Sequence, residues 1–215
     1  MTESEYFKDW YTVIPIKELH LIVNKVKNLY ATTKCTPSYR DIFKAFTIVS
    51  RRDCNVIILG QDPYPQEGVA TGIAFANRDN NNISPSLNVL MEASGITDVT
   101  LEAVSKQGVL FLNSSLTCQV NSAGSHSFIW RPFISKFLQN MSEVETGIVY
   151  ILMGEAAKSF EPYIGKYNHV LKCPHPAYYA RTKTKMPNTV FIKTNQILKE
   201  IYGREKQVQW NGGGN

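Results

Sequence analysis

The stretch Leu59-Gly60-Gln61-Asp62-Pro63-Tyr64-Pro65-Gln66-Glu67-Gly68 decides the fold, because it places a polar loop directly after a buried strand. The residues before it, Asn55-Val56-Ile57-Ile58-Leu59, are nearly all apolar and β-branched, which is typical of a strand buried on both faces. In open α/β sheets, ligands bind at the carboxyl ends of such strands. Asp62 and Tyr64 are therefore candidate site residues, although Asp-Pro is also ordinary turn chemistry and a tyrosine here is equally compatible with plain packing.

Length and composition indicate a globular protein. The chain has 215 residues, 43% of them hydrophobic and 19% charged, and shows no internal repeat or linker. We expect a single domain over residues 1–210 and a flexible tail over 211–215. No apolar run approaches the roughly 20 residues of a membrane span. The acidic start Met1-Thr2-Glu3-Ser4-Glu5 lacks the pattern of a secretory signal, so we expect a cytoplasmic location and no membrane.

The cysteines and the net charge limit the classes of function. Cys35, Cys54, Cys118 and Cys173 lie far apart, which argues against a zinc site or an iron–sulfur cluster, although ligation over long range stays open. Reduced thiols fit a cytosolic or nuclear compartment. The net charge of +5 is compatible with a polyanionic partner but too small to establish one.

Further strands and helices alternate along the chain. Buried-strand patterns recur at 108–113, 147–154 and 169–173. Helical spacing of apolar residues is found over 6–30 with a break near Pro15, over 41–46, from Ser84, over 130–141, from Glu155 and over 188–201. This alternation predicts an α/β fold: one three-layer αβα domain with a central, mainly parallel four-stranded sheet flanked by helices.

Four residues stand at or just beyond the ends of the four expected strands: Asp62, Asn113, Gly154 and His175. Parallel strands bring their carboxyl ends to one edge of the sheet, and Phe75 follows the first strand closely in sequence. Singly, Asn113 is also compatible with a turn, and His175 between two prolines is also compatible with a strand cap. Their joint placement favours a site at this edge.

Several motifs resemble those of uracil-DNA glycosylases of family 1, and they occur in the order of that family over nearly the whole chain. Gly60-Gln61-Asp62-Pro63-Tyr64 is similar to the water-activating loop, Phe111-Leu112-Asn113-Ser114-Ser115-Leu116-Thr117 to the uracil-reading strand, and His175-Pro176 to the start of the DNA-intercalating loop. Supporting similarities are Ser84-Pro85-Ser86-Leu87, Lys106-Gln107-Gly108-Val109-Leu110, Ser125-His126 and Phe191-Ile192-Lys193-Thr194-Asn195.

The resemblance implies a DNA repair enzyme that hydrolyses the N-glycosidic bond of deoxyuridine in single- or double-stranded DNA. The nucleotide would be flipped into a pocket, uracil released and an abasic site left, with no lyase step and with no metal or cofactor. It implies that Asp62 and His175 are catalytic. It also implies that the uracil is bound by Gln61, Tyr64, Phe75 and Asn113.

The same resemblance assigns roles to single side chains. Phe75 would stack on the uracil ring, and the Asn113 amide would pair with its polar edge and reject cytosine. Tyr64 would exclude the methyl group of thymine. His175, as a neutral imidazole, would donate to the developing oxyanion, and Asp62 would stabilise the sugar cation and orient the water. Contacts to DNA would come from Ser84, Ser86, Gly154, Tyr178, Tyr179 and Arg181.

The chain departs from the family pattern where DNA phosphates are expected. Pro65 stands where histidine is usual, and Glu155 follows Gly154 where serine is usual. The intercalating segment reads Ala177-Tyr178-Tyr179-Ala180 instead of Ser-Pro-Leu-Ser, so we expect a tyrosine to act as the wedge. Arg181, Lys183 and Lys185 either replace the lost phosphate contacts or form a solvated basic loop.

Pro65 and Ala177 resemble the divergent poxvirus members of the family, so we expect a divergent enzyme of viral or mobile-element origin. A viral protein would work in the cytoplasm or in the host nucleus. A proteinaceous glycosylase inhibitor or a replication partner is expected besides DNA, and the protein itself is expected to be a monomer. The alternative is a catalytically weak or inactive DNA-binding module, associated with replication, that kept the fold.

Overall fold

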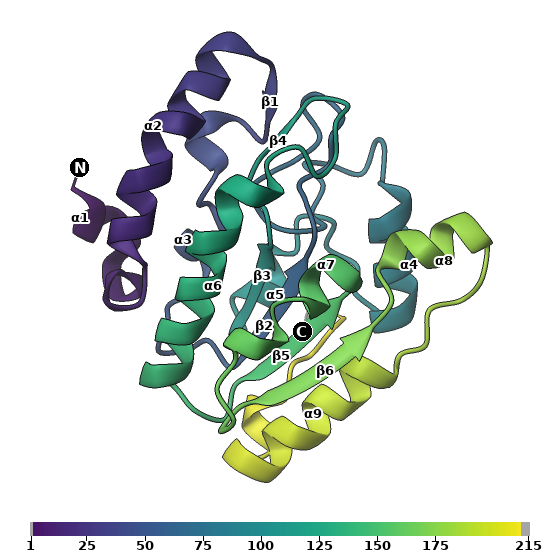
Figure 1. Ribbon diagram of the computed structural model, residues 1–215. Coiled ribbons are helices and arrows are strands. Elements are labelled where there is room, and N and C mark those ends of the chain that lie inside the picture. Colours follow the sequence, from purple (N-terminus) through teal and green to yellow (C-terminus); the bar gives the residue numbers. More distant parts are fainter. Residues whose placement is uncertain (1, 212–215) are drawn as a thin grey trace.

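The computed structural model describes residues 2–211 and has a parallel sheet at its centre (Figure 1). Its strands are β2 (Val56–Gly60), β3 (Val109–Asn113), β5 (Val149–Met153) and β6 (His169–Cys173). Their order is β3-β2-β5-β6, and every neighbouring pair is parallel. The predicted α/β fold and its four-stranded sheet are therefore confirmed.

The strands form because their sequences suit burial on both faces. Every residue of β2, β3 and β5 is buried, whereas β6 lies at the sheet edge and is mostly half-buried or exposed. Side chains alternate between faces along a strand. Ile57 and Leu59 accordingly contribute to one hydrophobic core, and Val56 and Ile58 contribute to the other on the opposite face.

One face of the sheet is covered by helices from the first half of the chain and from the middle. They are α1 (Glu3–Phe7), α2 (Ile16–Thr32), α3 (Ala45–Ile48), α6 (Ser127–Val144) and α7 (Glu155–Lys158). Aromatic rings fill this core: Trp10 meets Phe46 edge-on with the ring centroids 5.3 Å apart. The expected break near Pro15 is confirmed, because Pro15 caps α2 after a short 3₁₀ helix over Lys8–Thr12.

The other face is covered by α4 (Pro85–Ser94), α5 (Glu102–Ser105), α8 (Pro176–Thr182) and α9 (Thr189–Tyr202). Short 3₁₀ helices lie at Tyr39–Asp41, Glu161–Tyr163 and Arg204–Lys206. The helices α4 and α8 pack side by side at the carboxyl edge of the sheet (Figure 1). The expected helices that start at Ser84 and at Asn188 are confirmed, since these two residues cap α4 and α9.

Two local predictions were wrong. The helix expected over 41–46 is a 3₁₀ turn ending at Asp41 and a separate α3 starting at Ala45. The Asp41 carboxylate accepts hydrogen bonds from Ser38 and Arg78, which hold the turn closed. The intercalating segment expected as a loop is the helix α8, which Pro176 starts at its first position, where a proline costs no hydrogen bond.

A small second sheet supports the loop after β2. Here β1 (Cys35–Thr36) pairs antiparallel with β4 (Cys118–Gln119). The thiol of Cys118 donates to the carbonyl of Pro63 over 3.6 Å, so this sheet packs directly against the loop that carries Asp62. Cys35, Cys54, Cys118 and Cys173 are free thiols.

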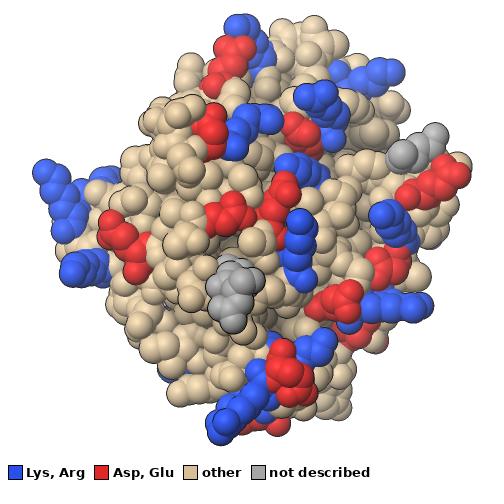
Figure 2. Space-filling view, turned by 180° about the vertical axis from the view of Figure 1, so that it is seen from behind, with Lys and Arg blue, Asp and Glu red and all other residues tan. Residues whose placement is uncertain are grey.

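The surface carries charges of both signs. Figure 2 shows the side opposite to the view of Figure 1, where basic and acidic side chains are interspersed rather than gathered into one patch. Between residues 2 and 211, no helix is both long and apolar enough to cross a lipid bilayer. The division into one domain and a tail stays a prediction, and the tail apart from Asn211 lies outside the described residues.

Candidate active site

A cavity of about 220 Å³ lies at the carboxyl edge of the sheet. Its walls come from the loop after β2, the segment before α4, the segment before α6 and the start of α8. They are formed by Gln61, Asp62, Pro63, Tyr64, Pro65, Phe75, Ser86, Ala123, His175 and Ala177. The volume lies below the roughly 300–1,000 Å³ of drug-sized sites, which suits a single small ring. The structure thus brings together both predicted catalytic residues and three of the four predicted uracil-binding residues.

Phe75 forms one wall of this cavity in a strained backbone conformation. Its φ is +68°, a region that side chains other than glycine rarely adopt. The hydroxyl of Tyr64 donates to the Phe75 carbonyl over 2.8 Å and so fixes this turn. The Phe75 ring is buried, and its centroid lies 5.4 Å from that of the His175 ring. Strain held in this way is common where a side chain is aimed for function.

Asn113 stands at the end of β3, directly opposite Gly60 on β2. It is buried, and its side-chain amide makes no hydrogen bond with the residues that the structure describes. A Cβ atom at Gly60 would lie 2.7 Å from Asn113 Oδ1 and 2.9 Å from Phe75 Cζ. Glycine at this position therefore keeps the space between the amide and the aromatic ring open.

The two oxygens of the Asp62 carboxylate have different surroundings. Oδ2 accepts a hydrogen bond from Gln61 Nε2 over 2.9 Å, whereas Oδ1 is buried without a partner. Burial raises the pKa of Asp62, and the hydrogen bond from Gln61 partly offsets that rise. A buried acceptor without a partner is costly, so Oδ1 is the natural place for a water or a positively charged group of a ligand.

His175 is a neutral imidazole with a defined tautomer. Burial lowers its pKa to about 4, so the ring carries no charge at neutral pH. Its Nδ1 accepts a hydrogen bond from the backbone N–H of Ala177 over 3.1 Å at the start of α8. The ring proton therefore lies on Nε2, which is free to donate to a ligand.

Gly154 makes room for His175. It ends β5 with φ of +89°, and a Cβ atom there would lie 2.8 Å from His175 Cβ. Glu155, the next residue, points into solvent and accepts a hydrogen bond from Lys158 over 2.6 Å. The negative charge of Glu155 is thus partly balanced by its neighbour one helical turn later.

The predicted DNA-binding residues divide between exposed and buried positions. Tyr178 is 46% exposed, whereas Tyr179 is 9% exposed and packs into the core beneath α8. The prediction of a wedge made by either tyrosine therefore narrows to Tyr178. Arg181 is exposed, and the Ser84 hydroxyl donates to Asn77 Oδ1 over 2.9 Å.

A wider groove of about 600 Å³ adjoins the cavity and shares four wall residues with it, Tyr64, Pro65, Ser86 and Ala177. Its other walls include Ser84, Ala180 and Arg181. Two residues that depart from the family pattern, Pro65 and Ala177, thus lie where groove and cavity meet. The groove leads from the site between α4 and α8, which makes it a natural path for a strand of nucleic acid.

A buried network that sequence reasoning missed fixes the segment before α6. The indole of Trp130 donates to Thr117 Oγ1 over 2.7 Å, and the same hydroxyl lies 2.9 Å from His126 Nδ1. His126 is buried, and this burial lowers its pKa. The network holds the segment that places Ala123 in the cavity wall. The sequence pointed to only part of the network, through the family-like pair Ser125-His126.

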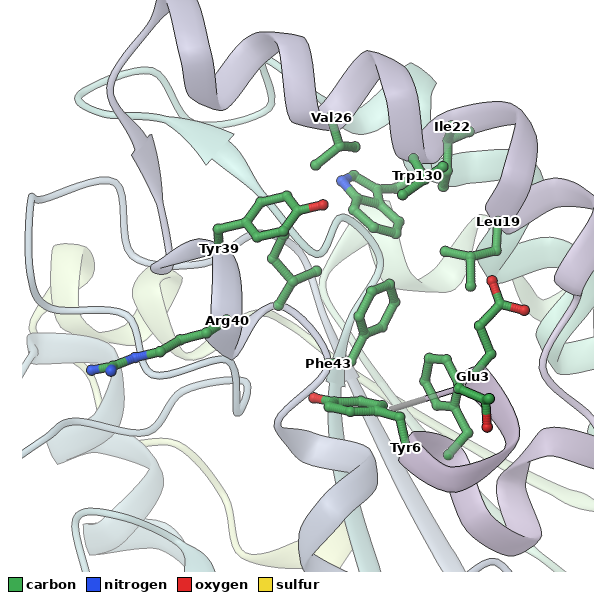
Figure 3. Close-up of a pocket in the computed structure, with 13 residues that line it drawn as sticks. Glu3, Tyr6, Leu19, Ile22, Val26, Tyr39, Arg40, Phe43 and Trp130 are labelled. Carbon is green, nitrogen blue, oxygen red and sulfur yellow. The ribbon is translucent and has the colours of Figure 1, made fainter.

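An apolar groove of about 480 Å³ lies elsewhere, between α1, α2 and the 39–43 segment (Figure 3). Tyr6, Tyr39, Phe43 and Trp130 face it, and only Glu3 and Arg40 add charge. None of the predicted site residues lines this groove. It lacks the convergent polar groups that a catalytic site needs, so the smaller cavity is the candidate active site.

The cavity at the sheet edge places an aromatic ring, a carboxylate and a neutral imidazole together, which is an arrangement typical of an α/β enzyme. Residues 46–199 match the family model of the uracil DNA glycosylase superfamily. A uracil-DNA glycosylase of Fusobacterium nucleatum subsp. nucleatum is 34% identical over 217 residues, which cover 97% of this chain and 92% of that protein. One from Campylobacter jejuni subsp. doylei is 38% identical over 169 residues, which cover 74% of this chain and 73% of the other.

Solved structures agree on the fold. A mimivirus uracil-DNA glycosylase superposes with a TM-score of 0.74 at 19% identity, covering 98% of this chain and 94% of that one. A mimivirus UNG variant in complex with UGI gives a TM-score of 0.82 at 18% identity, covering 98% of this chain and 91% of that one. The chain belongs to the uracil DNA glycosylase superfamily, and it is a DNA repair glycosylase.

Proposed function

We propose that this glycosylase hydrolyses the N-glycosidic bond of deoxyuridine in DNA, with Asp62 and His175 as its catalytic residues. One observation carries the proposal. A buried carboxylate oxygen without a partner and an imidazole that holds its proton on Nε2 line the same small cavity, with an aromatic wall between the loops that bear them. This pairing suits a reaction that builds positive charge on a sugar and negative charge on a departing base.

The reaction starts with a base that has left the helix, because the bond to be cleaved is out of reach inside a duplex. As the bond between C1′ and N1 breaks, its electron pair leaves with uracil. The Nε2–H group of His175 donates to the uracil oxygen on which the negative charge develops. The Asp62 carboxylate stabilises the cationic sugar.

Water completes the reaction. Its oxygen forms the new bond to C1′, and its proton passes to Asp62, whose raised pKa suits that role. The proton then passes on to the uracil anion, so the products are uracil and an abasic sugar. The proposed reaction is monofunctional and includes no lyase step.

Base selection follows from Asn113, which lies next to the cavity behind Gly60, and from Tyr64 in its wall. The side-chain amide of Asn113 pairs with the polar edge of uracil, and cytosine presents mismatched donors and acceptors there. Tyr64 fills the space beside carbon 5, where the methyl group of thymine would clash. Gln61 contributes indirectly, because its side chain donates a hydrogen bond that holds the Asp62 carboxylate in place.

The substrate strand runs along the groove between α4 and α8 in this proposal. Ser84, Ser86 and Arg181 line that groove and supply contacts to phosphates. Gly154 meets the strand beside His175. Tyr178 at the exposed face of α8 fills the place of the flipped base in duplex DNA. Contacts of this kind strengthen as salt is removed.

The partners and the setting of the enzyme belong to the same proposal. We assign it to family 1, as a monomer that acts on uracil-containing DNA. A protein inhibitor such as the UGI bound to the mimivirus relative, or a replication partner, is a further proposed partner. We place the protein in the cytoplasm, or in the host nucleus if its origin is viral rather than a mobile element.

The alternative, a DNA-binding module that kept the fold without catalysis, is not favoured, because the family relatives are named as glycosylases and the cavity keeps both catalytic groups. Incubation with a single-stranded oligonucleotide that contains one uracil tests the choice. Alkali-labile abasic sites should form at the uracil and not in the matched oligonucleotide with thymine. Binding without any abasic sites would support the alternative.

A further inference from the structure

Phe128 is the most exposed large hydrophobic residue in the described part of the chain. It lies in the first turn of α6 and is 94% exposed, compared with 73% for Leu21 and 68% for Tyr167. A single exposed aromatic ring is ordinary on a protein surface, so the significance of Phe128 depends on the groups around it.

A cavity of about 300 Å³ lies beside this ring. It is lined by Ser114, Ser127, Phe128, Arg131, Ala156, Ser159 and Phe160, which come from the end of β3, the start of α6 and the region of α7. In Figure 1 the carboxyl ends of the strands, the start of α6 and α7 lie at the same end of the sheet. The cavity and the exposed ring thus form one continuous surface, called here the α6 platform.

The α6 platform borders the candidate active site. Ser114 follows Asn113 directly, and its hydroxyl donates to the Gln61 carbonyl over 3.0 Å. Gln61 in turn lines the uracil cavity. On the other side of the α6 platform, Ala156 lies two residues after Gly154 in the sequence, and Gly154 packs against His175. A DNA strand that leaves the active site away from the groove between α4 and α8 therefore meets the α6 platform.

The chemistry of the α6 platform suits a nucleotide. Arg131 is held in place by a hydrogen bond from Nη1 to Ser159 Oγ over 2.9 Å and by the Phe160 ring, whose centroid lies 4.6 Å from its guanidinium carbon. The surface thus offers an aromatic face and a fixed positive charge.

We propose that Phe128 stacks on an unpaired base of the substrate strand that flanks the uracil nucleotide, with Arg131 facing a phosphate of that strand. This inference rests on the proposed function, because it needs DNA in the neighbouring site. Aromatic side chains bind bases of any sequence, since every base has a flat π-face. In a duplex the flanking base is already stacked and paired, so Phe128 favours single-stranded substrates.

Two variants of residue 128 and one control test the inference. Phe128→Ala removes the ring, Phe128→Trp keeps an aromatic face, and Tyr167→Ala removes a similarly exposed ring at the opposite, amino-terminal edge of the sheet. Binding to a single-stranded 15-mer, followed by fluorescence anisotropy, should weaken roughly tenfold in Phe128→Ala. Phe128→Trp and Tyr167→Ala should bind within about twofold of the unchanged protein.

Substrates in which one flanking base at a time is replaced by an abasic spacer locate the stacked base. At one spacer position the unchanged protein should bind roughly tenfold more weakly than it binds the intact strand. At that same position Phe128→Ala should bind the spacer strand as tightly as it binds the intact strand. An oligonucleotide in which abasic spacers replace the bases on both sides of uracil offers Phe128 no flanking base, so all four proteins should cleave it equally. Equal binding of the 15-mer by Phe128→Ala and the unchanged protein would overturn the inference. Failure of every protein to cleave the uracil-containing 15-mer would instead contradict the proposed function.

Discussion

Gly154 and His175 touch where their strands end: a Cβ atom at residue 154 would lie 2.8 Å from the Cβ atom of His175. The imidazole fits there because the residue that follows β5 is glycine. His175 is also tied to α8 through the hydrogen bond between Nδ1 and the Ala177 N–H. The proposed hydrogen-bond donor is thus positioned from two sides by groups that take no part in the proposed reaction.

Gly154→Ala should displace His175 and reduce turnover roughly a hundredfold, since a shift of about 1 Å in a catalytic group has that effect. The matched control is Gly95→Ala. Gly95 has a similar φ of +85°, but nothing lies within 4 Å of its added Cβ atom. The control bears the backbone strain without touching the site, so single-turnover rates should stay close to those of the unchanged protein. Equal losses in both variants would show that strain, rather than contact with His175, sets the rate.

The depressed pKa of His175 should appear as a dependence of stability on pH. Its pKa is 6.5 in an ordinary setting and about 4 in the folded protein. Between these values the unfolded chain binds a proton that the folded protein does not, so the free energy of unfolding falls as pH falls. The loss between pH 7 and pH 5 should be at most about 2 kcal/mol.

Urea unfolding at pH 7 and pH 5 measures this effect, with His175→Gln as the comparison. The variant should lose less stability than the unchanged protein by up to about 2 kcal/mol. The raised pKa of Asp62 works in the opposite direction, because a carboxylate that is harder to ionise in the folded protein favours folding at low pH. Both proteins keep Asp62, so the difference between them isolates residue 175. Parallel pH profiles would contradict the buried neutral imidazole.

Base choice should change when the two selecting residues change. Asn113→Asp should allow some release of cytosine, because a protonated carboxyl group donates and accepts in the pattern that cytosine needs. Tyr64→Ala should admit thymine, since one methyl group in a pocket is worth roughly 1–3 kcal/mol of discrimination. Both variants are checked by measuring the free base that they release from three oligonucleotides, which contain one cytosine, one thymine or one uracil.

Tyr64→Phe is the control for the second variant. It keeps the ring that excludes the methyl group but removes the hydrogen bond to the Phe75 carbonyl. It should stay specific for uracil and lose only a few-fold in rate. Thymine release by Tyr64→Phe would mean that the position of Phe75, and not the tyrosine ring, sets the selection.

Several of these features could be predicted from the sequence for a clear physical reason. Buried parallel strands need nearly continuous apolar, β-branched runs, so β2, β3 and β5 were visible as such. The strand β6 was also predicted, but its burial was not confirmed, because it lies at the sheet edge and is mostly half-buried or exposed. Polar residues directly after such runs must lie at one sheet edge, which brought Asp62 and His175 together before any coordinates were known. The resemblance to a known family then gave these positions roles.

Other features depend on three-dimensional contacts and left no local signal. Tyr178 and Tyr179 looked equivalent while the segment was expected to be a loop, but neighbouring residues on a helix point about 100° apart. One ring is therefore exposed and the other buried. The role of Gly60 was hidden in the same way, because its reason is the approach of Asn113 and Phe75 from distant parts of the chain.

The wedge prediction now concerns Tyr178 alone. Tyr178→Ala should weaken activity on duplex DNA roughly tenfold and change activity on single strands little, because only the duplex has a hole to fill. Tyr179→Phe is the control, since it keeps the buried ring, and it should affect both substrates equally. Initial rates on the same uracil oligonucleotide, with and without its complement, decide the point. Equal losses on both substrates in Tyr178→Ala would place the wedge elsewhere.

The single-turnover rate of Asp62→Asn on a single-stranded uracil oligonucleotide tests the central claim most directly. The substitution keeps the shape and the contact with Gln61 but removes the charge and the basic oxygen. The rate should fall roughly 10²–10⁴-fold while binding of the same oligonucleotide is kept, with Asp79→Asn in an exposed loop as the unaffected control. A rate for Asp62→Asn close to that of the unchanged protein would contradict the account.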